Sequence, residues 1–264
     1  MDKQKILAEL DTLFREGKLA EAEMNMNAWL TQGIQRKDHA LCLMMYNELT
    51  GLYRSTSRIP QAVEASDKAL SLIPVMRIEK TPEHATTLLN AATARRMAGD
   101  KETALGQFLE AENILQALGQ TDTYEMAGLK NNLSQLYQDL SQHEKALSNL
   151  DGALKIVQAL GANESDVATT RINKAISLMA LDRLQDAETE IQEAMRYYSS
   201  ETGLNSPHRA AALSASAELA VKRGDFNKAE ELYVEAMNMT KDKFGENYAY
   251  EVLSKNLADV RQKL

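Results

Sequence analysis

The fold is decided by residues 224–233, which read Gly-Asp-Phe-Asn-Lys-Ala-Glu-Glu-Leu-Tyr. Gly224 and Asp225 combine a residue that ends helices with a residue that caps the next helix. An Ala stands five places after the glycine, and the same pairing of a helix-break residue with an Ala recurs along the chain. These marker alanines are Ala22, Ala62, Ala104, Ala146, Ala187 and Ala229, spaced by 40, 42, 42, 41 and 42 residues. Such a period predicts a repeat protein with one supersecondary unit per repeat.

Small side chains also recur at two fixed distances from the markers. Seven residues after them come Ala69, Ala111, Ala153, Ala194 and Ala236, whereas the first repeat has Trp29. Twelve residues before them come Thr50, Ala92, Ser134, Ala175 and Ala217, whereas the first repeat has Leu10. Seven residues are two helical turns, so both small residues lie on one face. Small residues on facing helices allow close approach, and each repeat is therefore predicted to be a helical hairpin.

The pairing of these small residues with a Gly-x-hydrophobic-x-x-Ala turn resembles the tetratricopeptide repeat over nearly the whole chain. The usual repeat has 34 residues, so a period near 42 implies about two extra helical turns per hairpin. This long variant looks like the repeats of kinesin light chain and of bacterial solenoids. The resemblance implies an all-α fold, a right-handed α-α superhelix of about six hairpins with a C-terminal capping helix.

No linker-like tract divides the chain, so we expect one solenoid domain over residues 1–264. The predicted repeats span residues 3–37, 38–75, 82–120, 122–161, 164–203 and 207–245, and the capping helix spans residues 247–264. Leu253, Leu257 and Val260 lie at helical spacing and are expected to seal the last hairpin.

Composition excludes several classes of function. The chain has 30 basic and 38 acidic residues, a net charge of −8, and carries no basic stripe, so nucleic acid is not an expected partner. No apolar run approaches the roughly 20 residues of a membrane span, and we expect a cytoplasmic protein that does not act at a membrane. The single cysteine, Cys42, has apolar neighbours and is predicted to be a buried structural thiol.

A search for catalytic chemistry finds no constellation of nucleophile, base and stabiliser. The four histidines stand about a repeat or more apart, and no paired-ligand spacing for a metal occurs. Glycine motifs that bind phosphates or dinucleotides are missing as well. We therefore expect a protein that is not an enzyme and that needs no cofactor or metal.

In a solenoid of this kind the first helix of each hairpin lines the concave wall, which is where such proteins bind partners. This stripe is sampled 18, 14, 11 and 7 residues before each marker. It reads Thr86, Asn90, Thr93, Met97 in the third repeat, Gly128, Asn132, Gln135, Asp139 in the fourth and Thr169, Asn173, Ile176, Ala180 in the fifth. An Asn thus recurs 14 residues before three successive markers.

An amide offers both a donor and an acceptor, as pairing with a peptide main chain requires. The recurrence looks like the asparagine ladder of kinesin light chain and of O-linked N-acetylglucosamine transferase. We predict a peptide-binding set comprising Asn90, Asn132, Asn173, Thr86, Thr93, Arg96, Asn131, Gln135, Asp139 and Thr169. The alternative is that these asparagines bond to neighbouring helices or cap a local carbonyl, and so stabilise the stack.

One position argues against a known clamp of this family, which holds a C-terminal carboxylate with Lys, Asn and Arg on consecutive first helices. Fifteen residues before the markers the chain has Leu7, Asn47, Leu89, Asn131, Ile172 and Ser214. The predicted function is instead a scaffold or adaptor that binds a protein or an extended peptide. The alternatives are a regulatory receptor for a small signalling peptide and a self-assembling solenoid, for instance a homodimer.

Overall fold

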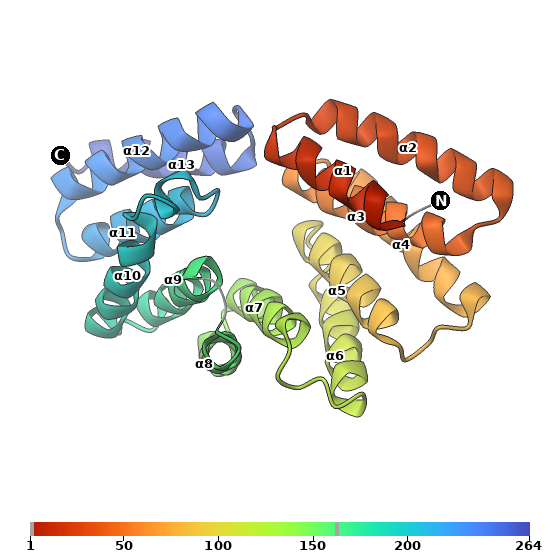
Figure 1. Ribbon diagram of the computed structural model, residues 1–264. Coiled ribbons are helices and arrows are strands. Elements are labelled where there is room, and N and C mark those ends of the chain that lie inside the picture. Colours follow the sequence, from red (N-terminus) through yellow and green to blue (C-terminus); the bar gives the residue numbers. More distant parts are fainter. Residues whose placement is uncertain (1–2, 162–163) are drawn as a thin grey trace. The chain divides into compact units, whose positions relative to one another are not determined.

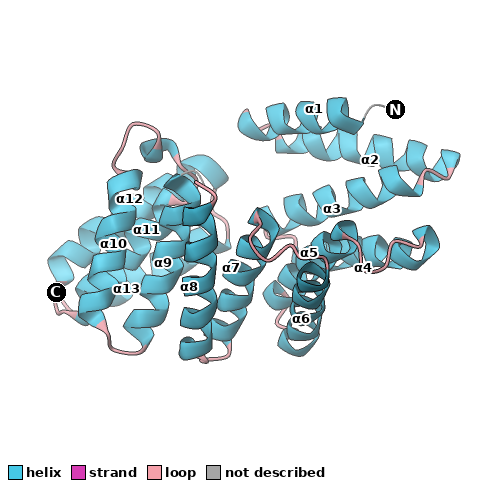
Figure 2. Ribbon diagram, turned by 60° about the horizontal axis from the view of Figure 1, so that its bottom comes forward, coloured by secondary structure: helices cyan, strands magenta, loops and turns pink. Residues whose placement is uncertain are grey.

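The computed structural model of the chain describes residues 3–161 and 164–264. Within these ranges the regular structure is helical and contains no strand (Figure 2). The helices are α1 (Lys3–Arg15), α2 (Leu19–Arg36), α3 (His39–Ser55), α4 (Ile59–Met76), α5 (Pro82–Met97), α6 (Lys101–Ala117), α7 (Tyr124–Asp139), α8 (His143–Ala159), α9 (Glu164–Ala180), α10 (Leu184–Tyr198), the short 3-10 helix η1 (Gly203–Asn205), α11 (Arg209–Lys222), α12 (Phe226–Phe244) and α13 (Tyr248–Arg261).

The helices form two compact units, the first up to Gly119 and the second from Gln120 (Figure 1). The first unit holds the hairpins α1–α2, α3–α4 and α5–α6. The second holds α7–α8, α9–α10 and α11–α12, and α13 packs against α12. Within the described residues, six helical hairpins followed by a C-terminal helix confirm the predicted all-α hairpin architecture, whereas the single-domain interpretation stays a prediction.

Helix ends follow the turn chemistry of the repeat. Gly99 and Gly224 have φ values of 84° and 79°, in the left-handed region that glycine adopts without strain. The next residue caps the following helix: Asp100 accepts a hydrogen bond from the Thr103 N–H at 3.2 Å, and Asp225 accepts one at 3.1 Å from its own helix. Each such turn reverses the chain and sets a second helix antiparallel to the first.

The predicted small residues form the centre of every hairpin. All six marker alanines are fully buried, as are the five alanines that follow seven residues later. The small residues twelve places before the markers, from Thr50 to Ala217, are fully buried as well. At the end of the second unit, Leu253, Leu257 and Val260 of α13 are buried against α11 and α12, as predicted. Close helix contact through small side chains therefore holds the hairpins together.

First helices of neighbouring hairpins also contact one another inside each unit. α3 packs on α5 in the first unit, and α9 packs on both α7 and α11 in the second. Second helices contact the first helix of the next hairpin, as α4 does α5 and α8 does α9. First helices therefore lie next to one another within each unit.

Candidate functional site

The predicted peptide-binding residues are divided between the two units. Thr86, Asn90, Thr93 and Arg96 lie on α5 in the first unit, whereas Asn131, Asn132, Gln135 and Asp139 lie on α7 and Thr169 and Asn173 on α9 in the second. The three asparagines of the predicted ladder thus belong to two different units. We therefore describe a site for each unit.

In the first unit, Asn90 bonds to a residue that the sequence analysis did not include in the site. The Asn90 Nδ2 donates to Asn47 Oδ1 on α3 at 3.2 Å, and the Asn47 Nδ2 donates to Thr87 Oγ1 on α5 at 3.1 Å. Arg54 donates a longer hydrogen bond of 3.5 Å to Asn90 Oδ1. We call Asn47, Thr87 and Asn90 the first amide clasp, because their side chains tie α3 to α5.

The second unit repeats this arrangement between α7 and α9. The Asn131 Nδ2 donates to Thr170 Oγ1 at 3.0 Å, and the Asn173 Nδ2 donates to Asn131 Oδ1 at 3.4 Å. These three residues, the second amide clasp, stand 84, 83 and 83 residues after their counterparts (131 − 47, 170 − 87, 173 − 90). The clasp therefore recurs with a period of two repeats rather than one.

The first clasp borders a cavity of about 590 Å³ within the first unit. We call it the first cavity. Its apolar lining comes mainly from α1, α3 and the end of α4, and its polar lining includes Asn47, Glu48, Thr86 and Asn90. A cavity of this size fits one or two side chains of a ligand, with the clasp amides at its wall.

The second clasp borders a cavity of about 380 Å³ within the second unit, the second cavity. Predicted site residues supply much of its lining, namely Asn131, Asn132, Gln135, Thr169 and Asn173. The remaining lining residues are Tyr124, Ala127, Gly128, Val157, Asp166 and His208.

Equivalent positions line the two cavities. Counted over two repeats, four pairs keep the same chemistry: Asn47 and Asn131, Thr86 and Thr169, Asn90 and Asn173, Glu83 and Asp166. Four other pairs differ: Ala40 and Tyr124, Leu43 and Ala127, Met44 and Gly128, Glu48 and Asn132. The amides and hydroxyls are thus shared, while the size and charge of the surrounding side chains are not.

The clasp bonds leave unused polar groups on some of the amides, although Asn131 donates with Nδ2 both to Thr170 Oγ1 and to the Ala127 carbonyl oxygen, the latter at 3.2 Å. Asn173 donates through Nδ2 to Asn131, and within the described part of the chain its Oδ1 accepts no hydrogen bond. Asn132 donates to the Gly128 carbonyl of its own helix at 2.9 Å, which leaves its second N–H and its Oδ1. The asparagines therefore make the stabilising bonds of the alternative hypothesis and keep groups at the cavity wall that a ligand could use.

Three predicted site residues line neither cavity. Thr93 is buried and donates to the Leu89 carbonyl of its own helix at 2.8 Å. Arg96 on α5 and the exposed Asp139 on α7 lie one to two turns further along their helices than the cavity-lining asparagines. A role for these three in binding stays a prediction.

Charged groups in the first unit have shifted pKa values. Burial raises the pKa of the Glu48 carboxyl, and the negative charge of Asp11 raises it further. Burial lowers the pKa of Arg54, as does the positive charge of Arg96. In the second unit, burial lowers the pKa of His208, against the opposing charge of Asp166. Desolvation therefore dominates around both clasps.

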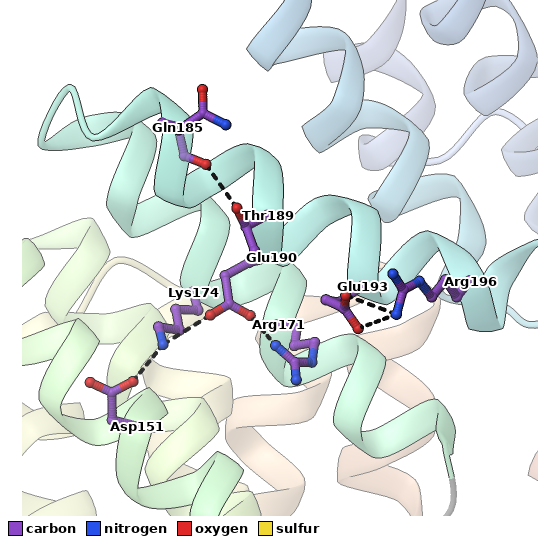
Figure 3. A network of polar contacts seen from close by, with 8 residues as sticks. All are labelled: Asp151, Arg171, Lys174, Gln185, Thr189, Glu190, Glu193 and Arg196. Carbon is purple, nitrogen blue, oxygen red and sulfur yellow. Dashed lines mark hydrogen bonds and ion pairs between the residues drawn. The ribbon is translucent and has the colours of Figure 1, made fainter.

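Lys174 follows the clasp residue Asn173 and stands where the fourth repeat has Leu133. Figure 3 shows the lysine between α8 and α10, with its Nζ 2.8 Å from Asp151 and 3.0 Å from Glu190. Arg171 of α9 contacts the same Glu190 at 2.5 Å. These carboxylates raise the pKa of Lys174 although burial acts to lower it. The network fixes α9, and with it the face that carries Thr169 and Asn173.

Within residues 3–161 and 164–264, no group of three or more His, Cys, Asp or Glu side chains is placed to hold a metal ion. Among the described helices, none combines the length and the apolar character that a membrane span requires.

Comparison with known proteins bears on the fold. Residues 166–242 match the family model described as tetratricopeptide repeat. No curated protein sequence matches the chain.

Similar solved structures include a Rap protein complexed with competence and sporulation factor, with a TM-score of 0.69 and 15% identity over 98% of this chain and 85% of that one. The apo form of the quorum sensor NprR from B. thuringiensis has a TM-score of 0.60 and 17% identity over 100% of this chain and 72% of that one. The TPR-like repeats of a Podosopora anserina protein described as a kinesin light chain have a TM-score of 0.60 and 17% identity, over 76% and 95% of the two chains.

These likenesses confirm the predicted resemblance at the level of the fold. The chain has the all-α fold of tetratricopeptide-repeat proteins, and its residues 166–242 match the repeat family itself.

Proposed function

We propose that the chain is a non-catalytic binding protein that holds extended peptide segments in the first and second cavities. The observation that supports this most directly is the recurrence of the same amides and hydroxyls, at equivalent positions, in the walls of two cavities. Stacking alone requires small and apolar residues between helices. The two amide clasps add polar groups at the walls of the cavities, where a peptide main chain could form hydrogen bonds.

The proposed mechanism is bonding of the peptide main chain to clasp amides, with side chains entering the cavities. A side-chain amide contributes about 1 kcal/mol net when it bonds to a ligand. Two or three such bonds give weak binding that tolerates many sequences. The apolar lining, above all in the first cavity, must then supply most of the affinity and the selectivity.

A regulatory receptor for a small signalling peptide is the second candidate function. It is favoured by the fold, which resembles a Rap protein complexed with competence and sporulation factor and the quorum sensor NprR. In such a receptor, peptide binding would change a contact elsewhere on the chain. Action in the cytoplasm and self-association into a homodimer stay predictions.

The proposed function is tested by selecting a random-peptide display library on the purified, immobilised chain. The comparison is a variant with Asn90→Ala, Asn132→Ala and Asn173→Ala, checked for helical content by circular dichroism. We expect the wild-type chain to enrich a family of peptides. The variant should bind those peptides about fivefold to thirtyfold more weakly, because it loses one amide from the first cavity and two from the second.

A matched control replaces three exposed helical asparagines that line neither cavity, with Asn27→Ala, Asn227→Ala and Asn238→Ala. This control should retain the enriched peptides. Equal loss of binding in both triple variants, or equal retention, would place the binding surface away from Asn90, Asn132 and Asn173. Failure of the wild-type chain to enrich any peptide would contradict the proposed function.

A further inference from the structure

The two cavities differ in charge at one equivalent position. Fourteen residues before the marker alanine, the second repeat has Glu48 and the fourth repeat has Asn132. Both residues line their cavity from the first helix of a hairpin, directly after a clasp asparagine. Each cavity has one acidic residue in common, Glu83 or Asp166, and the first cavity adds the carboxylate of Glu48 where the second has a neutral amide. This difference would give the two cavities different preferences for a ligand.

Glu48 is half-buried, and among the described residues none donates a hydrogen bond to its carboxylate or forms an ion pair with it. Asp11 of α1 adds a repulsive negative charge, and Glu83 also lines the cavity. Lys3 is the one described cation in the lining, and it makes no ion pair there. A partly desolvated carboxylate without a cation costs folding free energy, which a positively charged ligand group would recover.

The walls beside Glu48 suit a long basic side chain. The first cavity is lined by the apolar residues Leu7, Ala40, Leu43, Met44, Met76, Ile78 and Pro82. Lysine and arginine bury their methylene stems along apolar surfaces while the charged end reaches a polar partner. The first cavity offers such a surface and a carboxylate together, whereas the second cavity has Ala127, Gly128 and Asn132 at the equivalent places.

We propose that the first cavity selects a lysine or arginine side chain of a bound peptide through Glu48, and that the second cavity, with Asn132, makes no such selection. This inference rests on the proposed function, because it assigns a preference to the same peptide site. The first cavity would hold the methylene stem against its apolar wall and the cationic end at the carboxylate.

The test uses the full chain and pools of fluorescent random peptides in which one position is fixed as Lys, Arg, Gln or Leu. Binding is measured by fluorescence polarisation. For wild type we expect the Lys and Arg pools, at one or more positions, to bind about tenfold more tightly than the Gln pool, because a charge-assisted hydrogen bond replaces a neutral one. The Glu48→Asn variant, which copies the second cavity, should lose this preference.

Two controls separate local selection from overall charge. Glu110→Gln removes one negative charge from an exposed position on α6 outside the cavity and should keep the preference. Asn132→Glu, introduced into the Glu48→Asn chain, should restore only a smaller preference for the basic pools, because Ala127 and Gly128 give the second cavity less apolar surface for a long side chain. Glu48→Gln serves as a second variant if Glu48→Asn has reduced helical content.

Failure of the selection for basic side chains can be distinguished from failure of peptide binding itself. The inference is overturned if the wild-type chain binds the Lys and Gln pools with equal affinity. It is also overturned if the preference for basic pools survives in both Glu48 variants. Peptide binding itself would stand in either case. A lost preference in Glu110→Gln would also overturn it, because overall charge would then explain the selection. If no pool binds the wild-type chain, the proposed function fails and the inference fails with it.

Discussion

Each asparagine of the amide clasps has two tasks, tying two first helices together and lining a cavity. An amide has two N–H groups and an acceptor oxygen, so it can serve a neighbouring helix and a ligand at once. Asn47 shows this most clearly, since it donates to Thr87, accepts from Asn90 and lines the first cavity. The asparagines are therefore expected to affect both stability and binding when they are replaced.

Replacement of Asn47 by leucine tests the structural task. Leu7 and Leu89 stand at the equivalent position in two other repeats, so the shape is tolerated. Asn47→Leu removes the bonds that Thr87 and Asn90 make to Asn47 and should lower the free energy of unfolding by about 1 to 3 kcal/mol. Asn132→Ala, which removes only a bond within one helix, should change it by less than about 0.5 kcal/mol. If urea denaturation shows the same change in the free energy of unfolding for both variants, the clasp does not stabilise the contact between α3 and α5.

Glu48 gives a prediction on pH. Its pKa is raised in the folded chain, so the folded state binds a proton more readily than the unfolded state, and this group's contribution to stability falls as pH rises through that pKa. Glu48→Gln should therefore raise the melting temperature at pH 8 and leave it unchanged near pH 3.5, where the glutamate is protonated in both states. The wild-type chain and the Glu48→Gln variant share the neighbouring charges Asp11, Lys3 and Glu83, so these charges do not cause the difference. A lower melting temperature at pH 8 would contradict an uncompensated carboxylate.

At the scale of helices, the hairpin contacts and the ion-pair network around α9 have different origins. Small residues bring the helices of a hairpin together, and the repeat period fixes where they occur. The network of Asp151, Arg171, Lys174 and Glu190 joins α9 to α10 of its own hairpin and to α8 of the preceding hairpin (Figure 3). The α9 helix is thus held by contacts that the repeat period does not specify.

Removal of the central lysine measures the contribution of this network. The Lys174 and Glu190 side chains are 20% and 13% exposed, so Lys174→Met leaves a largely buried carboxylate with Arg171 as its remaining partner. We expect a loss of about 1 to 3 kcal/mol in the free energy of unfolding. Arg196→Met breaks the exposed pair with Glu193 in the same hairpin and should cost less than about 0.5 kcal/mol. If chemical denaturation gives the two variants similar losses in the free energy of unfolding, the network stabilises the chain no more than one exposed ion pair does.

Replacement of two glycines by alanine, one at a time, tests the close backbone approach in the segment that follows α10. A Cβ atom on Gly203 would lie 1.9 Å from the backbone oxygen of Tyr197, so Gly203→Ala requires the backbone to shift and should destabilise the chain by about 1 to 3 kcal/mol. Gly51 lies within α3 with open space around it, and Gly51→Ala should stabilise the chain by about 0.5 to 1 kcal/mol. Thermal melting of the two variants should show shifts of opposite sign. Shifts of the same sign would contradict the close approach at Gly203.

Sequence patterns predicted the hairpins because the period places one small residue, such as Ala104 or Ala146, at every helix crossing. They did not predict which partner each asparagine bonds to. The bond from Asn90 to Asn47 joins neighbouring repeats and depends on how α3 and α5 are rotated, which a single-repeat period does not specify. A usable signal was the alternation of Leu7, Asn47, Leu89 and Asn131, which shows a period of two repeats. Lys174 lay outside any pattern, because its partners come from α8 and α10.

For the whole molecule, the central claim is that each unit carries its own peptide-binding cavity. The first unit has a larger and more apolar cavity with Glu48, and the second has a smaller one with Asn132 and Gln135. Two cavities with shared amides and different linings are expected to bind peptides of different composition.

Photo-crosslinking tests this claim most directly. Peptides selected on the wild-type chain are synthesised with a photoreactive residue, crosslinked to the full chain, and the attachment points are mapped by mass spectrometry. We predict crosslinks on the cavity-lining residues of α3 and α5, of α7 and α9, or of both sets, and their loss in the Asn90, Asn132, Asn173 triple variant. Crosslinks confined to α2, α6, α12 or α13 would contradict it.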